Sequence, residues 1–157
     1  MADMIKVRSA SDSIIVINAP EIPLVKTWSK RNAVYPIAKD ALIQAFYSTS
    51  LEALIKEGML IVEDAGFLME VGLIQDVKEQ VAVELTPALM KKAIGVIPTW
   101  EFKDLLDKLS EHQISDLAEY AIANHGELRM DRIDMLSKAS HKNILKAIEL
   151  YRKAQED

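Results

Sequence analysis

Between residue 86 and the end of the chain, signals that begin and end helices follow one another at short intervals. Thr86 and Pro87 pair an N-cap residue with a proline in the first helical position, where its missing N–H costs nothing. Ser110 and Gln113 have the spacing of a capping box, in which each side chain accepts a hydrogen bond from the other residue's backbone N–H. Short loops favour neighbouring helices packed on one another, so we expect a bundle of about five helices.

Three more helices of this bundle are expected, one from Pro98 and two over residues 131–138 and 141–154. After Pro98, apolar residues recur at the i, i+3, i+4 and i+7 spacing of a buried helix face. The helix that follows Ser110 carries a similar face. The predicted core of this half of the chain therefore includes Phe102, Leu105, Leu106, Leu117 and Ile122.

The first third of the chain has a different pattern, because β-branched residues cluster in short runs between turn residues. We expect strands near residues 5–7, 14–17, 24–28 and 33–35. Prolines interrupt this region, and proline favours the edges of sheets and turns over central strands. The three prolines are Pro20, Pro23 and Pro36.

Short helices are expected after these strands. Residues 39–47 have helical apolar spacing, and Thr49 with Glu52 suggests a second capping box that opens a helix ending at Gly58. A buried strand over residues 59–62 and a short helix capped by Asp64 should follow. Residues 77–85 alternate well enough to predict a further strand, with a helix as the alternative.

These patterns predict an α+β fold, with a small β-rich N-terminal unit containing short helices and a C-terminal bundle of about five helices. The expected units cover residues 1–85 and 86–157, with a soft boundary, and a single domain is the alternative. Both a two-unit chain and a single domain are consistent with a length of 157 residues, half of them hydrophobic.

Composition excludes several classes of function. The chain has no cysteine, which removes disulfides, thiolate catalysis and cysteine-ligated metals. Its formal net charge of −5 disfavours a general nucleic-acid binder. The N-terminal residues lack the apolar core of a signal peptide, and the apolar runs are too short to span a bilayer. We therefore expect a soluble, cytoplasmic protein without a membrane partner.

The sequence also offers no arrangement typical of an active site. His112, His125 and His141 do not have the spacing of metal-ligand pairs, and each is expected near a helix end, with His141 opening the last helix. The glycine-rich phosphate loops and nucleophile motifs of common enzymes are missing. We predict no catalytic residue, no cofactor, no metal site and no enzymatic activity.

A basic turn and the last helix are the candidate partner-binding surfaces. Around Trp28, the cations Lys26, Lys30 and Arg31 could contact phosphates while an aromatic ring stacks on a base. A solvated turn with one aromatic in the core is the favoured interpretation of that pattern. A pair of helices over residues 110–124 and 131–138 has helix-turn-helix length, but its segment 130–134 is as acidic as it is basic, which weakens base readout.

The last helix is amphipathic, and its apolar stripe consists of Ile144, Leu145, Ile148 and Tyr151. Such a stripe usually closes its own bundle, and docking on another subunit is the alternative. Of the basic turn and this helix, we favour the helix as the contact site, because hydrophobic burial dominates stable assembly.

The segment VKTWSKRNAVYPIAKDALIQAFYSTSLEALIKEGMLIVED resembles segments of small proteins encoded by tailed bacteriophages. The pairing of LSEHQISDLAEYAIAN with DMLSKASHKNILKAIEL is similar to them as well. The resemblance rests on the spacing of Trp, Gly and aliphatic residues, and it carries over no functional residue. It implies a virion or an infected cell as the setting, where many small proteins act by assembly.

We therefore expect a structural or assembly component of a phage particle. Its partners would be other protein subunits, in a homo-oligomer or a larger assembly, and it would lie in the cytoplasm during synthesis and in the virion afterwards. The alternative is a small phage-encoded regulator that binds nucleic acid or a host protein.

Overall fold

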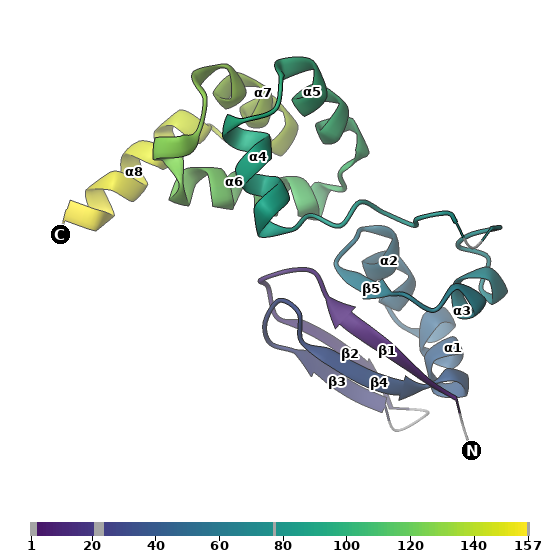
Figure 1. Cartoon of the computed structure of the whole chain (residues 1–157). Helices are drawn as coiled ribbons and strands as arrows, with labels where there is room; N and C mark the ends of the chain where they lie inside the picture. Colours follow the sequence, from purple (N-terminus) through teal and green to yellow (C-terminus); the bar gives the residue numbers. More distant parts are fainter. Residues whose placement is uncertain (1–2, 21–23, 77, 157) are drawn as a thin grey trace. The chain divides into compact units, whose positions relative to one another are not determined.

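The computed structural model describes residues 3–20, 24–76 and 78–156, and the chain divides into two compact units, Met1–Glu84 and Leu85–Asp157 (Figure 1). In the described residues, all strands belong to the first unit and five α-helices to the second. The predicted α+β fold is confirmed. Pro23 and Val77 lie outside the described residues.

The first unit contains two small antiparallel sheets. In one, β1 (Met4–Ser9) lies between β4 (Val34–Ala38) and β5 (Leu60–Val62). In the other, β2 (Ile15–Ala19) pairs with β3 (Leu24–Trp28). Side chains along β1 and β2 alternate between exposed and buried, as expected for strands with one face on a core.

Three helices complete the core of the first unit. They are α1 (Lys39–Ser48), α2 (Leu51–Lys56) and α3 (Ala65–Glu70). The predicted Asp64 cap of α3 is confirmed, because its carboxylate accepts a hydrogen bond from the Phe67 backbone N–H at 2.9 Å. The buried cluster combines strand residues with helix residues, among them Val7, Ile17, Trp28, Leu42, Leu51 and Phe67.

The predicted capping box at Thr49 is wrong. Thr49 ends α1, and its hydroxyl donates to the Ala45 carbonyl at 2.6 Å while accepting from the Leu51 N–H at 3.1 Å. The N-cap position of α2 belongs to Ser50, whose side chain makes no capping hydrogen bond. Because α1 ends directly before α2 begins, the Thr49 hydroxyl bonds back to the preceding helix.

The strand predicted over residues 77–85 is wrong as well. The structure assigns no strand to residues 78–85, and no ladder joins them to β5. The consecutive polar residues Lys78, Glu79 and Gln80 deprive the segment of a continuous apolar face. It runs instead as an irregular segment along the first unit.

The second unit contains α4 (Pro87–Gly95), α5 (Thr99–Lys108), α6 (Glu111–Ala123), α7 (Met130–Ser140) and α8 (Ile144–Glu156), with a short 3₁₀ turn, η1 (His125–Glu127), after α6. Both predicted caps are confirmed. Thr86 accepts from the Leu89 N–H at 3.1 Å, and Ser110 forms a reciprocal capping box with Gln113.

The beginning of the last helix differs from the prediction. His141 does not open it, because His141 adopts the left-handed conformation, with φ of 58°, at the C-terminal cap of α7. Asn143 lies before α8, and its side-chain oxygen accepts from the Lys146 N–H at 3.0 Å. Asn143 therefore caps the helix, which begins at Ile144, three residues later than His141.

The predicted core of the second unit is confirmed only in part. Phe102 and Leu117 are fully buried. Leu105, Leu106 and Ile122 are half-buried, so the prediction is wrong for these three. The face of α5 that packs inward is narrower than its apolar spacing indicates, and it buries Phe102 and then Leu109 just after the helix.

Candidate functional site

The aromatic ring of the predicted basic turn lies in the core of the first unit. Trp28 is fully buried, and its indole N–H donates to the Val7 carbonyl at 3.0 Å. Its ring meets that of Tyr35 edge to face, with 5.6 Å between ring centroids. A ring held in this way has no free face for a nucleobase, so the stacking role of Trp28 is wrong and the interpretation of a core aromatic holds.

The cations around Trp28 do not form a free basic patch. The ammonium of Lys26 lies 5.6 Å from the centre of the Tyr35 ring. Arg31 donates to the Ala10 carbonyl at 2.7 Å and pairs with Asp12 at 3.1 Å. Lys30 is exposed. Arg31 thus makes its contacts within its own unit. This weakens the prediction that the cations of this turn bind nucleic-acid phosphates.

The apolar stripe of the last helix closes its own bundle. Ile144 and Ile148 are buried, and Tyr151 is half-buried with its ring edge-to-face on His125, 6.2 Å between centroids. Ile144 and Ile148 are not available to a second subunit while the second unit is folded. The docking role expected for Ile144 and Ile148 is therefore wrong, whereas Leu145 of the same stripe is 51 % exposed.

The segment considered as a recognition helix contains a fully buried cation, Arg132. Its guanidinium donates to the Ala93 carbonyl at 3.2 Å and to the Ile97 carbonyl, and it lies over the Phe102 ring, 4.9 Å from the centroid. Burial lowers the pKa of Arg132, and Asp131 partly offsets this. Arg132 therefore fastens α7 to the end of α4 and cannot reach a base edge.

Asp131 completes this connection. Its carboxylate accepts from the Thr99 hydroxyl at 2.6 Å and from Arg132 at 2.8 Å. The hydrogen bond from Thr99 lowers the pKa of Asp131 below its ordinary value, against the opposing effect of desolvation, and the Arg132 charge lowers it further. These bonds place the first turn of α5 beside the first turn of α7.

Three large apolar side chains are exposed around this junction. They are Val96 at 67 %, Trp100 at 68 % and Met130 at 79 % exposure. Trp100 follows Thr99 in α5, and Met130 precedes Asp131 in α7, so the Thr99–Asp131 hydrogen bond brings their helix turns together. We call Val96, Trp100 and Met130 the Trp100 corner. Contiguous exposed apolar surface is a mark of interaction sites.

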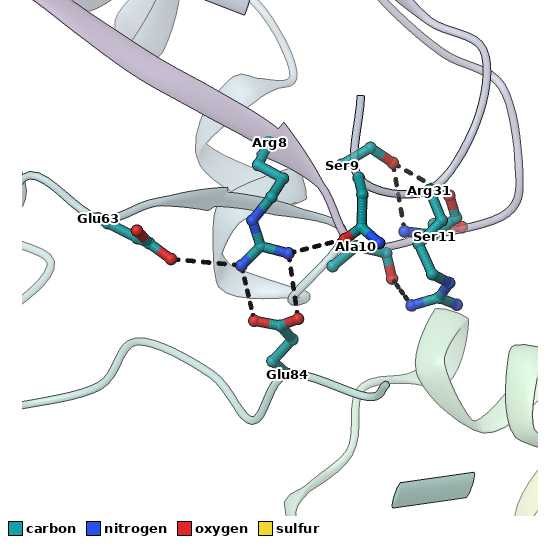
Figure 2. A network of polar contacts seen from close by, with 8 residues as sticks. Arg8, Ser9, Ala10, Ser11, Arg31, Glu63 and Glu84 are labelled. Atoms are coloured by element: carbon teal, nitrogen blue, oxygen red, sulfur yellow. Dashed lines mark hydrogen bonds and ion pairs between the residues drawn. The ribbon is translucent and has the colours of Figure 1, made fainter. Parts of the chain in front are cut away.

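In the first unit, an arginine clasps the irregular segment that follows α3 (Figure 2). Arg8 on β1 makes a bidentate contact with the Glu84 carboxylate, at 2.8 and 3.1 Å, and a further bond to Glu63 at 3.3 Å. The hydrogen bond from Arg8 lowers the pKa of Glu84, with desolvation opposing it. This clasp holds residues 79–84 along the first unit.

A cavity of about 280 Å³ lies between that segment and the rest of the first unit. Its walls come from α2, β5, the region of α3, and residues 79–84. Aliphatic side chains dominate them, and the three acidic side chains among the lining residues are Glu63, Glu79 and Glu84. The apolar members include Ile55, Leu60, Val62, Leu68, Ile74 and Val81.

No group of three or more His, Cys, Asp or Glu side chains in the described residues is arranged to hold a metal ion. Over the same part of the chain, no helix has both the length and the apolar character needed to cross a bilayer. Comparisons with protein-family models, with curated proteins and with solved structures give no match for this chain.

Sequence reasoning missed the Trp100 corner and the cavity of the first unit. Trp100 and Met130 stand at the starts of their helices, where periodicity says little about burial, and their proximity depends on the Thr99–Asp131 contact. The cavity had one signal in the sequence. Residues 57–84 contain seven Asp or Glu and a single Lys. This excess of acidic over basic residues indicates an acidic surface, but it does not predict the cavity.

Proposed function

We propose that this chain is a non-enzymatic protein that acts by binding other protein subunits, as a structural or assembly component of a tailed-phage particle. The Trp100 corner carries the proposal. Tryptophan and methionine are enriched at the centres of protein interfaces, and tryptophan is prominent among the residues that dominate binding energy. The phage setting is supported by the resemblance of residues 25–64 and of the last helices to small phage proteins. The chain would be made in the cytoplasm and retained in the virion.

The partner at the Trp100 corner would be an apolar surface of another subunit. Val96, Trp100 and Met130 each expose an aliphatic or aromatic side chain, whereas Ile144 and Ile148 of the α8 stripe are buried in their own unit. Covering the corner would remove apolar area from water, which is the main source of stability in assembly. A contact of this kind is expected to tolerate salt.

The test uses the full chain, tagged and expressed in cells infected by the phage that encodes it. The wild-type chain should co-sediment with purified particles in many copies. Replacing Trp100 and Met130 by Ser should reduce that fraction by about tenfold or more, as expected for removal of an interface centre. The matched control replaces Leu145 and Leu150 by Ser, two other exposed apolar residues, and should sediment as the wild type does.

Circular dichroism must show the same helix content in all three chains. A chain absent from purified particles would contradict the assembly role and favour the regulator. Equal losses in the Trp100 and Leu145 variants would contradict the assignment of the Trp100 corner as the contact surface.

A further inference from the structure

The cavity in the first unit lies at the edge of a sheet. Leu60, Ile61, Val62 and Glu63 all line it, although successive side chains of a strand point to opposite faces. Consecutive lining residues are expected where a cavity runs along the edge of a strand. β5 is an edge strand, since it pairs with β1 on one side and with no described strand on the other.

The register shows which backbone groups of β5 point outward. Ser9 lies opposite Leu60, and the Ala10 N–H donates to the Met59 carbonyl at 2.9 Å. In an antiparallel ladder this pattern makes Ser9 and Leu60 a non-hydrogen-bonded pair. The N–H and C=O groups of Leu60 and Val62 therefore point away from β1, while those of Ile61 point toward it.

These outward groups have no backbone partner among the described residues, although Leu60 and Val62 are both buried. Buried backbone N–H and C=O groups are nearly always hydrogen-bonded, since an unpaired one costs free energy. Residues 79–84 flank the cavity on its far side but form no ladder with β5. Because Leu60 and Val62 are 1 % and 4 % exposed, an added strand would reach this edge by displacing residues 79–84 from the cavity.

The cavity volume and charge restrict what that strand can be. A volume of about 280 Å³ is at or below the lower end of small-molecule sites, which span about 300–1,000 Å³, so it suits a few aliphatic side chains. The lining residues include three carboxylates, Glu63, Glu79 and Glu84, and no Lys or Arg, and Arg8 pairs with Glu63 and Glu84. Glu63 is 80 % exposed and is held by a single bond to Arg8. This charge favours a cationic partner.

We propose that the outer edge of β5 binds an extended, basic segment of a partner protein, which adds to the sheet as a further strand. Its backbone would bond to Leu60 and Val62, and alternate side chains would enter the aliphatic cavity. Its Lys or Arg side chains would face Glu63 and Glu79. This site belongs to the first unit and does not depend on the Trp100 corner.

Residue-resolved amide hydrogen exchange tests the proposal on the full chain. The probe is a short synthetic peptide that alternates valine and lysine. In the free protein, the amides of Leu60 and Val62 should exchange faster than the Ile61 amide, which faces β1. Adding the peptide should slow exchange at Leu60 and Val62, while a matched peptide with proline at alternate positions, which lacks the required N–H groups, should leave it unchanged.

Charge variants test whether the carboxylates of Glu63 and Glu79 attract the basic peptide. Glu63→Lys with Glu79→Lys should weaken peptide binding at low salt by about tenfold. Asp40→Lys with Glu52→Lys makes the same change in net charge at two residues that do not line the cavity, and should have a much smaller effect. A peptide alternating valine and glutamate should not bind.

Three results would overturn the proposal. Unchanged exchange at Leu60 and Val62 with saturating peptide would show that the edge does not accept a strand. Slow exchange in the free protein at every concentration would show that the chain's own residues 79–84 pair with β5. Protection that rises with protein concentration alone would make a second copy the occupant. The Trp100 corner test is unaffected by any of these.

Discussion

Two arginines hold separate segments of their own unit together, Arg132 in the second and Arg8 in the first. Arg132 spans α7 and the carbonyls of Ala93 and Ile97, and Arg8 joins β1 to Glu84. The planar guanidinium offers five donors in a fixed fork, which suits several acceptors at once. Neither role is visible in a sequence pattern, because both arginines stand among other charged residues of ordinary spacing.

Removing the guanidinium of Arg132 should strongly destabilise the second unit. Arg132→Leu leaves the Ala93 and Ile97 carbonyls without this donor and removes one of the three groups bound to Asp131, and we expect a loss of about 3–5 kcal/mol in the free energy of unfolding. Arg129→Leu is the matched control. Arg129 also pairs with Asp131, at 3.3 Å, but is exposed, so its loss should cost less than about 1 kcal/mol. Urea unfolding followed by circular dichroism measures both, and equal costs would contradict the role given to Arg132.

The Arg8–Glu84 clasp should weaken in acid. Because the pKa of Glu84 is lowered in the folded chain, its ionised form contributes stability above the ordinary pKa of Glu. That contribution is lost as the pH falls through the lowered pKa. Glu84→Gln should therefore cost stability near neutral pH and cost progressively less toward about pH 3. Urea midpoints monitored by Trp28 fluorescence, in a Trp100→Phe background, provide the measurement, and a cost that does not depend on pH would contradict it.

Gly95 permits a close backbone approach in the second unit. A Cβ atom at this position would lie 2.6 Å from the Glu127 carbonyl oxygen, which is backbone and cannot rotate away. Gly95→Ala should therefore cost about 1–3 kcal/mol through overpacking. Gly126→Ala is the control, because its Cβ would meet nothing within 4 Å. If thermal unfolding shows equal midpoints for the two variants, the close approach at Gly95 is not rigid.

At the scale of elements, local signals predict helix starts better than they predict burial. Thr86 and Ser110 cap the helices that their spacing indicates, because a cap depends only on neighbouring backbone groups. Thr49 has similar spacing but ends α1, since two helices abut there. The alternation in residues 77–85 suggested a strand, yet a ladder requires a partner edge that the sequence does not specify.

The same limit applies to α5, where apolar spacing does not separate buried from half-buried residues. Leu117 on α6 is fully buried, whereas Leu106 is half-buried. Leu117→Ala should cost about 2–5 kcal/mol, as other buried leucines do, and Leu106→Ala clearly less. Urea midpoints compare the two variants directly. A larger loss at Leu106 would contradict the observed packing of α5.

For the whole molecule, the fold class and the order of elements, apart from the strand over residues 77–85, could be predicted because each depends on local periodicity and turn residues. The candidate sites could not be. Trp28, Ile144 and Ile148 were chosen as contact residues, and tertiary packing buries all three. The surfaces that remain exposed depend on contacts between distant residues, such as Thr99 with Asp131 and Arg8 with Glu84.

The two units should show separate unfolding transitions, because each has its own buried core and small domains of this size fold cooperatively. The chain has two tryptophans, and the structure places one in each unit, with Trp28 buried and Trp100 exposed. In a Trp100→Phe background, Trp28 fluorescence follows the first unit, while helical circular dichroism is dominated by the second. Leu117→Ala should lower the urea midpoint seen by circular dichroism and leave the Trp28 midpoint unchanged. If both midpoints fall together, the two cores unfold as one cooperative system.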